Sequence, residues 1–217
     1  SFQQEGGKMS AATRAKLGGV IDIAYGNEPL QTLDVFAPDG AKDAPVIFYI
    51  HGGGWRAGSK NGYSFPAETM NEAGILWVPI DYGLAPDYTV DQIVDHVRSA
   101  FAWVYGNIRE HGGDPDQIYV LGNSAGGHLT GTLLMSGWHG EYAVPGNAIK
   151  GACAMSGVFD MEALVHAAYG YNNELQMDLK SARAHSPLFH IPQELPPIVI
   201  GYGGPELEGF RKQSRDF

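Results

Sequence analysis

The stretch Ile118-Tyr-Val-Leu-Gly-Asn-Ser-Ala-Gly-Gly-His-Leu129 decides the fold, because it sets Ser124 between a short apolar strand and a helix. Gly122 and Gly126 stand two residues on either side of Ser124. A serine held at a strained backbone angle leaves no room for side chains at those two positions. The pentapeptide alone is weak evidence in a chain with 30 glycines, but the flanking strand and helix support it. The stretch therefore predicts a nucleophile elbow with Ser124 at its tip.

A second glycine-rich motif follows another predicted strand. The run Pro-Val-Ile-Phe-Tyr-Ile at 45–50 is continuously apolar, which is typical of a buried parallel strand, and it leads into His51-Gly-Gly-Gly-Trp55. Attack on an acyl carbonyl places negative charge on its oxygen, and each N–H donor aimed there is worth on the order of a hundredfold in rate. We expect the backbone N–H groups of Gly53, Gly54 and Ala125 to form this oxyanion hole. His51 is better explained as a structural hydrogen-bonding residue than as a catalytic base.

Four ordered motifs resemble those of the α/β-hydrolase superfamily. They are His51-Gly-Gly-Gly-Trp55, Asp81-Tyr-Gly-Leu-Ala-Pro86, Gly112-Gly-Asp-Pro-Asp116 and Gly122-Asn-Ser-Ala-Gly-Gly-His-Leu129. Within the superfamily the chain resembles the hormone-sensitive-lipase-like carboxylesterases and, more closely, the kynurenine formamidase (arylformamidase) type, a likeness that Phe210-Arg-Lys-Gln-Ser214 strengthens. The resemblance runs from about residue 20 and is far more specific for fold than for substrate. It implies a mostly parallel central sheet flanked by helices.

Strand and helix patterns alternate along the chain, which favours one α/β domain over residues 1–217. The first two strands should pair as an antiparallel hairpin. We expect a small insertion at about 159–197 to lie over the catalytic end of the sheet and to shape the substrate pocket. The expected strands are 20–25, 32–37, 46–50, 75–80, 118–121, 149–155 and 198–202, and the expected helices are 63–73, 89–111, 126–136 and 205 onward.

The catalytic acid is expected after the strand at 198–202, because the chain order in this fold is serine, acid, histidine. The resemblance places a carboxylate at Glu206, where the family more often has aspartate. Glu208 is the second candidate, and both glutamates could simply favour the N-terminus of the following helix. Asp160 is a weaker candidate because it follows the preceding strand.

None of the eight histidines fits the catalytic base. His128 lies one helical turn beyond Ser124, too far along the helix axis to reach the serine oxygen. Only His166 and His190, in the insertion, could approach the pocket. The family position of the histidine lies one strand beyond the acid. We therefore expect the final strand and helix, with the catalytic histidine, to lie outside these residues, since a sheet ending at 198–202 would expose an apolar edge.

Composition excludes several other functions. A net charge of −10 disfavours nucleic acid and anionic membranes as partners, and no apolar stretch is long enough to cross a bilayer. With Cys153 as its only cysteine, the chain can form no internal disulfide, so a cytoplasmic setting is the simplest interpretation. The spacing of histidines and acids suggests no metal site, and no phosphate loop or dinucleotide motif is present. We thus expect no cofactor, and the oligomeric state stays open.

Two functional classes remain from the sequence. The first is a serine hydrolase that cleaves small carboxylic esters or aryl formamides through an acyl-enzyme on Ser124. The second is a catalytically impaired hydrolase fold that only binds a small ligand. An aromatic substrate pocket is a further expectation, with core or lid packing of the same rings as its alternative. The residues expected to line this pocket are Trp55, Tyr82, Asn123, Phe159, Tyr169 and Tyr171.

Overall fold

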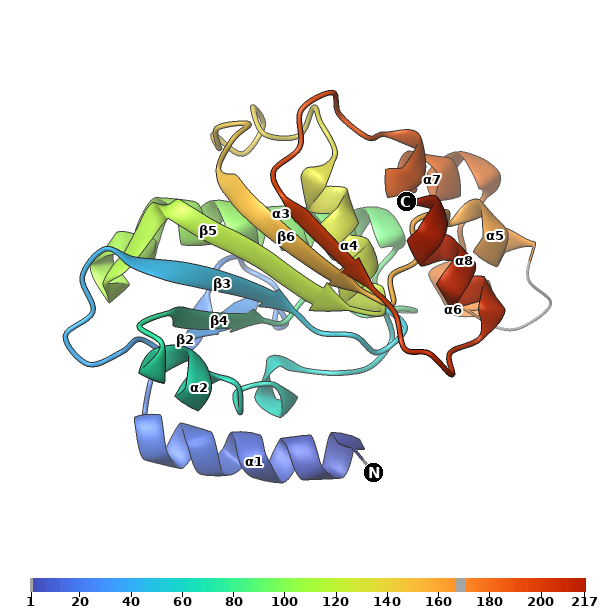
Figure 1. Ribbon diagram of the computed structural model, residues 1–217. Helices are drawn as coiled ribbons and strands as arrows, with labels where there is room; N and C mark the ends of the chain where they lie inside the picture. The colour runs from blue at the N-terminus through green and yellow to red at the C-terminus, as the bar shows by residue number, and fades with distance from the viewer. Residues whose placement is uncertain (1, 167–170) are drawn as a thin grey trace.

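The computed structural model describes residues 2–166 and 171–217 and contains one seven-stranded sheet (Figure 1). Its strand order is β1-β2-β4-β3-β5-β6-β7, with β1 antiparallel to β2 and β2 antiparallel to β4. The remaining neighbours are parallel, so β3 to β7 end at the same edge of the sheet. The strands are β1 (Val20–Ala24), β2 (Thr32–Val35), β3 (Ala44–Ile50), β4 (Leu76–Ile80), β5 (Gly113–Asn123), β6 (Ile149–Met155) and β7 (Ile198–Gly201).

Helices cover the two faces of the sheet unequally. The helices α3 (Val90–Asn107) and α4 (Ala125–Leu134) pack behind the sheet in Figure 1, whereas α1 (Phe2–Leu17) and α2 (Ala67–Glu72) lie on the opposite face near β4. Side chains along β3 alternate accordingly: Phe48 joins the main core under α3 and α4, and Tyr49 joins a smaller cluster beneath α2.

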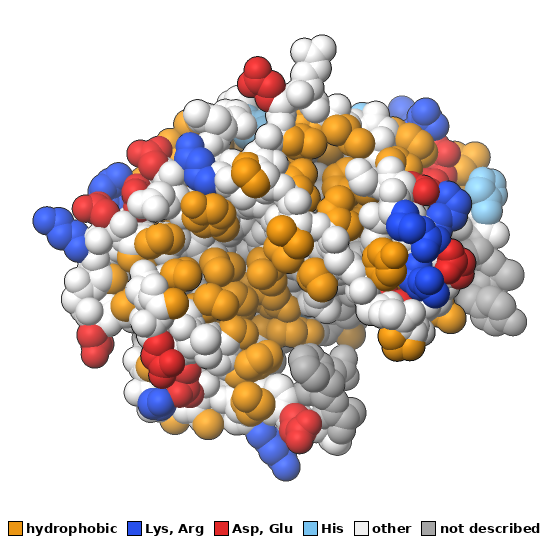
Figure 2. All heavy atoms as spheres, viewed as in Figure 1, with side chains coloured by type: hydrophobic (Ala, Val, Ile, Leu, Met, Phe, Trp, Pro, Cys, Tyr) orange, Lys and Arg blue, Asp and Glu red, His pale blue; other side chains and the backbone are white. Residues whose placement is uncertain are grey.

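Part of the α1 side of the sheet is bare and apolar. Figure 2 shows hydrophobic side chains gathered over β3, β5 and β6 on this face. Tyr119 is 41% exposed and Val199 on the edge strand β7 is 62% exposed. They border an apolar hollow on this face that Pro45, Ile47, Leu121 and Cys153 also line.

Short helices gather at the carboxyl ends of β5, β6 and β7 (Figure 1). The segment 159–197 contains α5 (Glu162–Val165), α6 (Tyr171–Leu175), α7 (Leu179–Ala184) and a 3₁₀ turn at Pro187–Phe189. The helix α8 (Glu208–Asp216) lies beside them. Two further 3₁₀ turns occur at Lys60–Gly62 and Ile108–His111.

The predicted strands are confirmed, one predicted helix is shorter than expected, and one helix was not predicted. All seven strands form, although β5 begins at Gly113 instead of 118, and the expected hairpin of β1 and β2 is present. The helix expected at 63–73 begins only at Ala67, because Pro66 serves as its N-cap. The helix α1 was not predicted, because its two adjacent glycines and weak apolar periodicity are not typical of a helix.

A buried charge cluster fastens α1 and the 3₁₀ turn at Lys60–Gly62 to the hairpin. The Asp34 side chain is fully buried, and its Oδ2 accepts a hydrogen bond from Arg14 Nη1 at 2.5 Å. Its Oδ1 lies 2.9 Å from Lys60 Nζ, whose side chain is 1% exposed. The largely exposed Asp22 carboxylate also binds Lys60. Because Asp34 and Lys60 are both buried, removing Asp34 leaves the Lys60 ammonium with only this exposed partner.

We expect Asp34→Ala to lower the free energy of unfolding by about 3–5 kcal/mol, because it leaves the buried Lys60 ammonium without its buried partner. Chemical denaturation measures the loss. Lys16→Ala, which breaks the exposed ion pair with Glu68, is the matched control and should change stability little. Equal effects of the two substitutions would contradict this account of the cluster.

Candidate active site

Ser124 lies on a strained turn between β5 and α4. Its backbone angles are φ 55° and ψ −119°, a conformation that residues with a side chain rarely adopt. Its N–H donates to the Met155 carbonyl at 2.8 Å. A Cβ at Gly122 would lie 2.2 Å from the Gly126 carbonyl oxygen, and one at Gly126 would lie 2.0 Å from the Ile50 carbonyl oxygen. The turn therefore admits only glycine at both positions, as its sequence pattern predicts.

The glycine-rich loop after β3 lies against this turn. A Cβ at Gly52 would lie 3.2 Å from Ser124 Cβ, which brings the loop beside the serine. Gly53 has φ 130° and Gly54 has φ 62°, and a Cβ on Gly53 would meet the Ala57 carbonyl at 1.8 Å. Within the described residues, the N–H groups of Gly53 and Gly54 donate to no acceptor. Ala125 begins α4, so its N–H has no acceptor within that helix.

His51 has a structural role at the start of this loop. Its side chain is 1% exposed and its Nδ1 lies 2.7 Å from the Gly52 carbonyl oxygen. The ring stacks on Tyr82 at 4.4 Å, and the Tyr82 hydroxyl donates to the His51 carbonyl at 2.7 Å. Asp81 Oδ1 lies 3.5 Å from His51 Nε2. These contacts fix the path of the chain into Gly53 and Gly54.

The three candidate acids have different surroundings. Glu206 Oε1 accepts hydrogen bonds from the Ser156 hydroxyl at 2.5 Å and from the Gly203 N–H at 3.0 Å. Its Oε2 is buried and has no hydrogen-bond partner among the described residues. Asp160 Oδ1 instead accepts from the N–H of Glu162 at the start of α5. Glu208 is exposed and pairs with Arg211 and Arg215. Only Glu206 keeps a buried carboxylate oxygen free to orient another group.

None of the eight histidines, all of which the structure describes, hydrogen-bonds the Ser124 hydroxyl. His190 Nε2 lies 2.9 Å from the Arg183 carbonyl oxygen, and His185 Nε2 lies 2.7 Å from Asp91. His166 ends α5 at the surface. The expectation that His166 or His190 could approach the serine gains no support from these contacts.

His128 is a fully buried packing residue. Trp55 Nε1–H donates to its Nδ1 at 3.1 Å, and its Nε2 lies 2.8 Å from the His185 carbonyl oxygen, to which it donates as the neutral tautomer. Burial lowers the pKa of His128 to about 3, so the ring is neutral at ordinary pH. The residue therefore joins α4, the glycine-rich loop and the segment after α7.

The structure corrects the expected aromatic pocket. Trp55 is 2% exposed, and Tyr82 and Phe159 are fully buried, so these rings pack in the core instead of facing a cavity. Asn123 stays near the serine, where its Oδ1 accepts from the Tyr49 hydroxyl at 2.8 Å. Tyr169 lies outside the described residues, as does the side chain of Tyr171.

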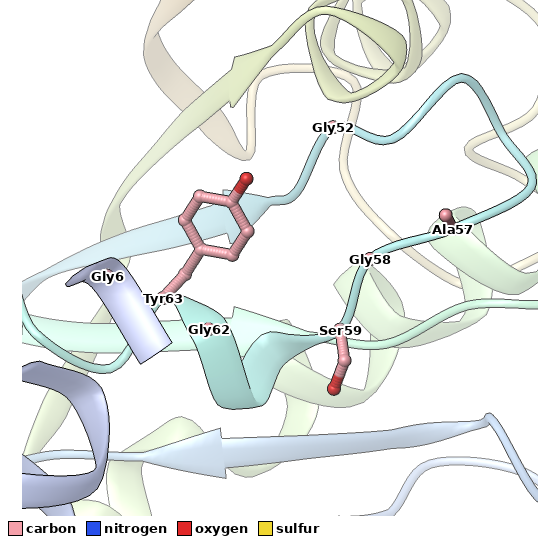
Figure 3. Close-up of a pocket in the computed structure, with 7 residues that line it drawn as sticks. All are labelled: Gly6, Gly52, Ala57, Gly58, Ser59, Gly62 and Tyr63. Atoms are coloured by element: carbon pink, nitrogen blue, oxygen red, sulfur yellow. The ribbon is translucent and has the colours of Figure 1, made fainter. Parts of the chain in front are cut away.

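Sequence reasoning missed a hollow beside the glycine-rich loop. A cavity of about 290 Å³ lies between α1 and the segment 52–63, and Figure 3 shows the Tyr63 hydroxyl pointing toward Gly52 within it. The Tyr63 ring packs on Tyr49 with centroids 5.1 Å apart, and burial raises the pKa of Tyr63, which keeps it a neutral donor. The remaining lining residues are Gly6, Ala57, Gly58, Ser59 and Gly62.

Among the described residues, no group of three or more histidine, cysteine, aspartate or glutamate side chains could hold a metal ion. No described helix combines the length and apolar character needed to span a bilayer.

Comparison with known protein families shows where this chain belongs. The model of the BD-FAE family matches residues 33–215, which contain the glycine-rich loop, the elbow and Glu206. The chain belongs to the BD-FAE family. Kynurenine formamidase of Salmo salar is 31% identical over 205 residues, an alignment that spans 91% of this chain and 67% of that protein. The probable carboxylic ester hydrolase LipM of Mycobacterium tuberculosis is 34% identical over 203 residues, spanning 84% of this chain and 47% of LipM.

Solved structures agree on the fold of this BD-FAE member. A putative thioesterase from a Silicibacter species superposes with a TM-score of 0.85 at 23% identity, covering 99% of this chain and 79% of that one. The metagenomic carboxylesterase EstE1 superposes with a TM-score of 0.70 at 21% identity, covering 100% of this chain and 81% of that one. The chain therefore has the α/β-hydrolase fold, and its family relationships make it a hydrolase. It spans two thirds of the matched formamidase and about half of LipM.

Burial of neutral His128 predicts that acid destabilises this hydrolase. A histidine whose pKa falls from 6.5 in the unfolded chain to about 3 in the folded protein stabilises the fold fully above pH 6.5, and that stability is lost as the pH falls toward 3. Near pH 5 we expect His128 alone to lower the free energy of unfolding by about 2 kcal/mol relative to pH 7. Burial also lowers the pKa of His96 and His139, which adds to the loss.

Urea titrations near pH 7 and near pH 5 measure this difference in the original chain and in two variants. His128→Gln should shrink the difference, whereas His111→Gln, at the partly exposed end of the 3₁₀ turn Ile108–His111, should leave it unchanged. An undiminished acid effect in His128→Gln would show that other groups cause the destabilisation.

Proposed function

We propose that this protein is a serine hydrolase that cleaves carboxylic esters or aryl formamides of small substrates through an acyl-enzyme on Ser124. One observation carries the proposal: the strained serine lies beside a loop whose Gly53 and Gly54 N–H groups have no acceptor within the described residues. A turn at φ 55° costs free energy that a purely structural serine does not require. N–H donors that have no acceptor and lie next to the serine can stabilise the oxyanion that develops during attack.

In the proposed reaction, Ser124 Oγ attacks the substrate carbonyl carbon while a histidine takes the hydroxyl proton. The carbonyl oxygen becomes negatively charged and accepts hydrogen bonds from the N–H groups of Gly53, Gly54 and Ala125. The tetrahedral intermediate then expels an alcohol or amine, which receives the proton from the histidine. Water attacks the acyl-enzyme by the same route and releases a carboxylic acid.

Glu206 is proposed to orient that histidine. Ser156 and the Gly203 N–H hold Oε1, which leaves the buried Oε2 to accept the histidine Nδ1–H. The eight histidines of the chain make no hydrogen bond to Ser124, so none of them is assigned as the base. The carboxylate would fix the tautomer of the imidazole and stabilise its protonated form.

The substrate class rests on the named relatives. The matched proteins include a kynurenine formamidase and a carboxylic ester hydrolase, and both reactions need the same oxyanion hole and serine. The competing proposal from the sequence, a ligand-binding protein without turnover, has no use for unpaired N–H groups beside a strained serine. A fluorophosphonate probe separates the two proposals, because it labels an activated serine covalently.

Ser124→Ala in the full-length protein should lower turnover of p-nitrophenyl acetate on the order of a millionfold and abolish probe labelling, because the nucleophile is lost. Circular dichroism should show an unchanged fold. Ser136→Ala, at an exposed position beyond α4, is the control and should keep full activity. Residual turnover above about a hundredth of the original rate would remove Ser124 as the nucleophile.

Glu206→Gln should lower turnover of the same ester by up to about ten-thousandfold, because the amide cannot hold the histidine in the required tautomer or stabilise its charge. The matched control is Asp160→Asn, whose side chain only accepts from a backbone N–H at α5 and which should cost far less. If Asp160→Asn proves the more damaging change, the acid belongs to the loop after β6.

A further inference from the structure

We infer that the cavity between α1 and the segment 52–63 is the acyl pocket, which receives the short group attached to the carbonyl carbon of the substrate. This inference rests on the proposed function of Ser124. It assigns a role to α1 and to Tyr63, neither of which belongs to the proposed catalytic groups. It also replaces the pocket that the sequence predicted from rings that turn out to be buried.

Gly52 places the cavity next to the turn that carries the nucleophile. That residue lines the cavity, and a Cβ built on it would lie 3.2 Å from Ser124 Cβ. The next two residues carry the N–H groups proposed to hold the carbonyl oxygen. A substrate whose oxygen lies on these donors would have its carbonyl carbon beside Gly52. Gly52 is one of the residues that line the cavity (Figure 3).

The strand order indicates which part of the substrate would enter the cavity. The strands follow the order β4-β3-β5-β6-β7, with Ser124 after β5 and Glu206 after β7. In the proposed mechanism the histidine bridges these two residues, which would place it on the β6 and β7 side of the serine. The leaving group must face that histidine to receive its proton. The cavity lies on the opposite side of the serine, next to β3. Since the leaving group faces the histidine, the acyl group is the part of the substrate that would enter the cavity.

The dimensions and walls of the cavity favour a short acyl group. About 290 Å³ lies at the lower end of the roughly 300–1,000 Å³ typical of small-molecule sites. Four of its seven lining residues are glycines, which expose backbone and leave space for ligand. The Tyr63 ring, supported by Tyr49, forms its aromatic wall. A formyl, acetyl or butyryl group fits such a space, whereas a long flexible chain does not.

Two adjacent glycines of α1 provide a matched test. Gly6 lines the cavity, and a Cβ there would lie 3.5 Å from the Gly62 carbonyl oxygen and 3.8 Å from Phe65 Cε1, both ordinary contacts. A Cβ on Gly7 meets no atom within 4 Å, and Gly7 does not line the cavity. Because both residues are helical, the same substitution changes helix propensity equally at the two positions.

The experiment measures kcat/KM of the full-length protein for p-nitrophenyl acetate, butyrate and octanoate. The original protein should prefer acetate and butyrate to octanoate. Gly6→Leu fills the cavity and should lower the butyrate-to-acetate ratio by about tenfold or more, a loss typical of a contracted apolar pocket. Gly7→Leu should leave the ratio unchanged. Equal ratios in Gly6→Leu and the original protein overturn the inference.

Tyr63→Ala enlarges the same cavity and should shift preference the other way, raising the octanoate-to-acetate ratio by about tenfold. A purely structural role for Tyr63 would lower all three rates together and would also overturn the inference. The proposed function fails separately, through ester turnover or probe labelling that survives Ser124→Ala. Active enzyme with an unaltered acyl profile in Gly6→Leu thus refutes the acyl pocket alone.

Discussion

The backbone conformation of Ser124 is the constraint on which the rest of the site depends. A non-glycine residue at positive φ costs on the order of 1–3 kcal/mol and persists only where its surroundings enforce it. Close packing of Gly122 and Gly126 and the hydrogen bond from Ser124 N–H to Met155 provide that enforcement. Each of these contacts comes from the sheet or from α4. The serine is therefore held by the most deeply packed part of the molecule.

The parallel strands extend this constraint to the other groups. Because β3, β5, β6 and β7 run in the same direction, the residues that follow them meet at one edge. The glycine-rich loop follows β3, Ser156 follows β6 and Glu206 follows β7. The Ser156 hydroxyl then binds Glu206 across two neighbouring strand ends. Strand register therefore sets the positions of the glycine-rich loop, Ser156 and Glu206. Their side chains can interact over short distances.

The sequence predicted the parts of the site that depend on the backbone conformation of neighbouring residues. The glycine spacing around Ser124 and the triplet after β3 follow from backbone sterics, which residue types display directly. Burial of aromatic rings depends on distant packing, so Trp55, Tyr82 and Phe159 looked like pocket residues although they lie in the core. The helix α1 was not predicted, because two adjacent glycines are unfavourable in a helix. The cavity wall formed by Gly6 of α1 was therefore not predicted either. The role of Tyr63 follows only from the position of α1.

The short helices near the carboxyl ends of β5, β6 and β7 have a thermodynamic consequence. The helices α5, α6 and α7 contain four, five and six residues, too few to persist without tertiary contacts. The exposed pair of Arg56 with Glu174 ties α6 to the glycine-rich loop. We expect the amide hydrogens of this layer to exchange with solvent at a lower opening free energy than those of β3 and β5. The segment between β6 and β7 would then open locally while the elbow at Ser124 stays intact.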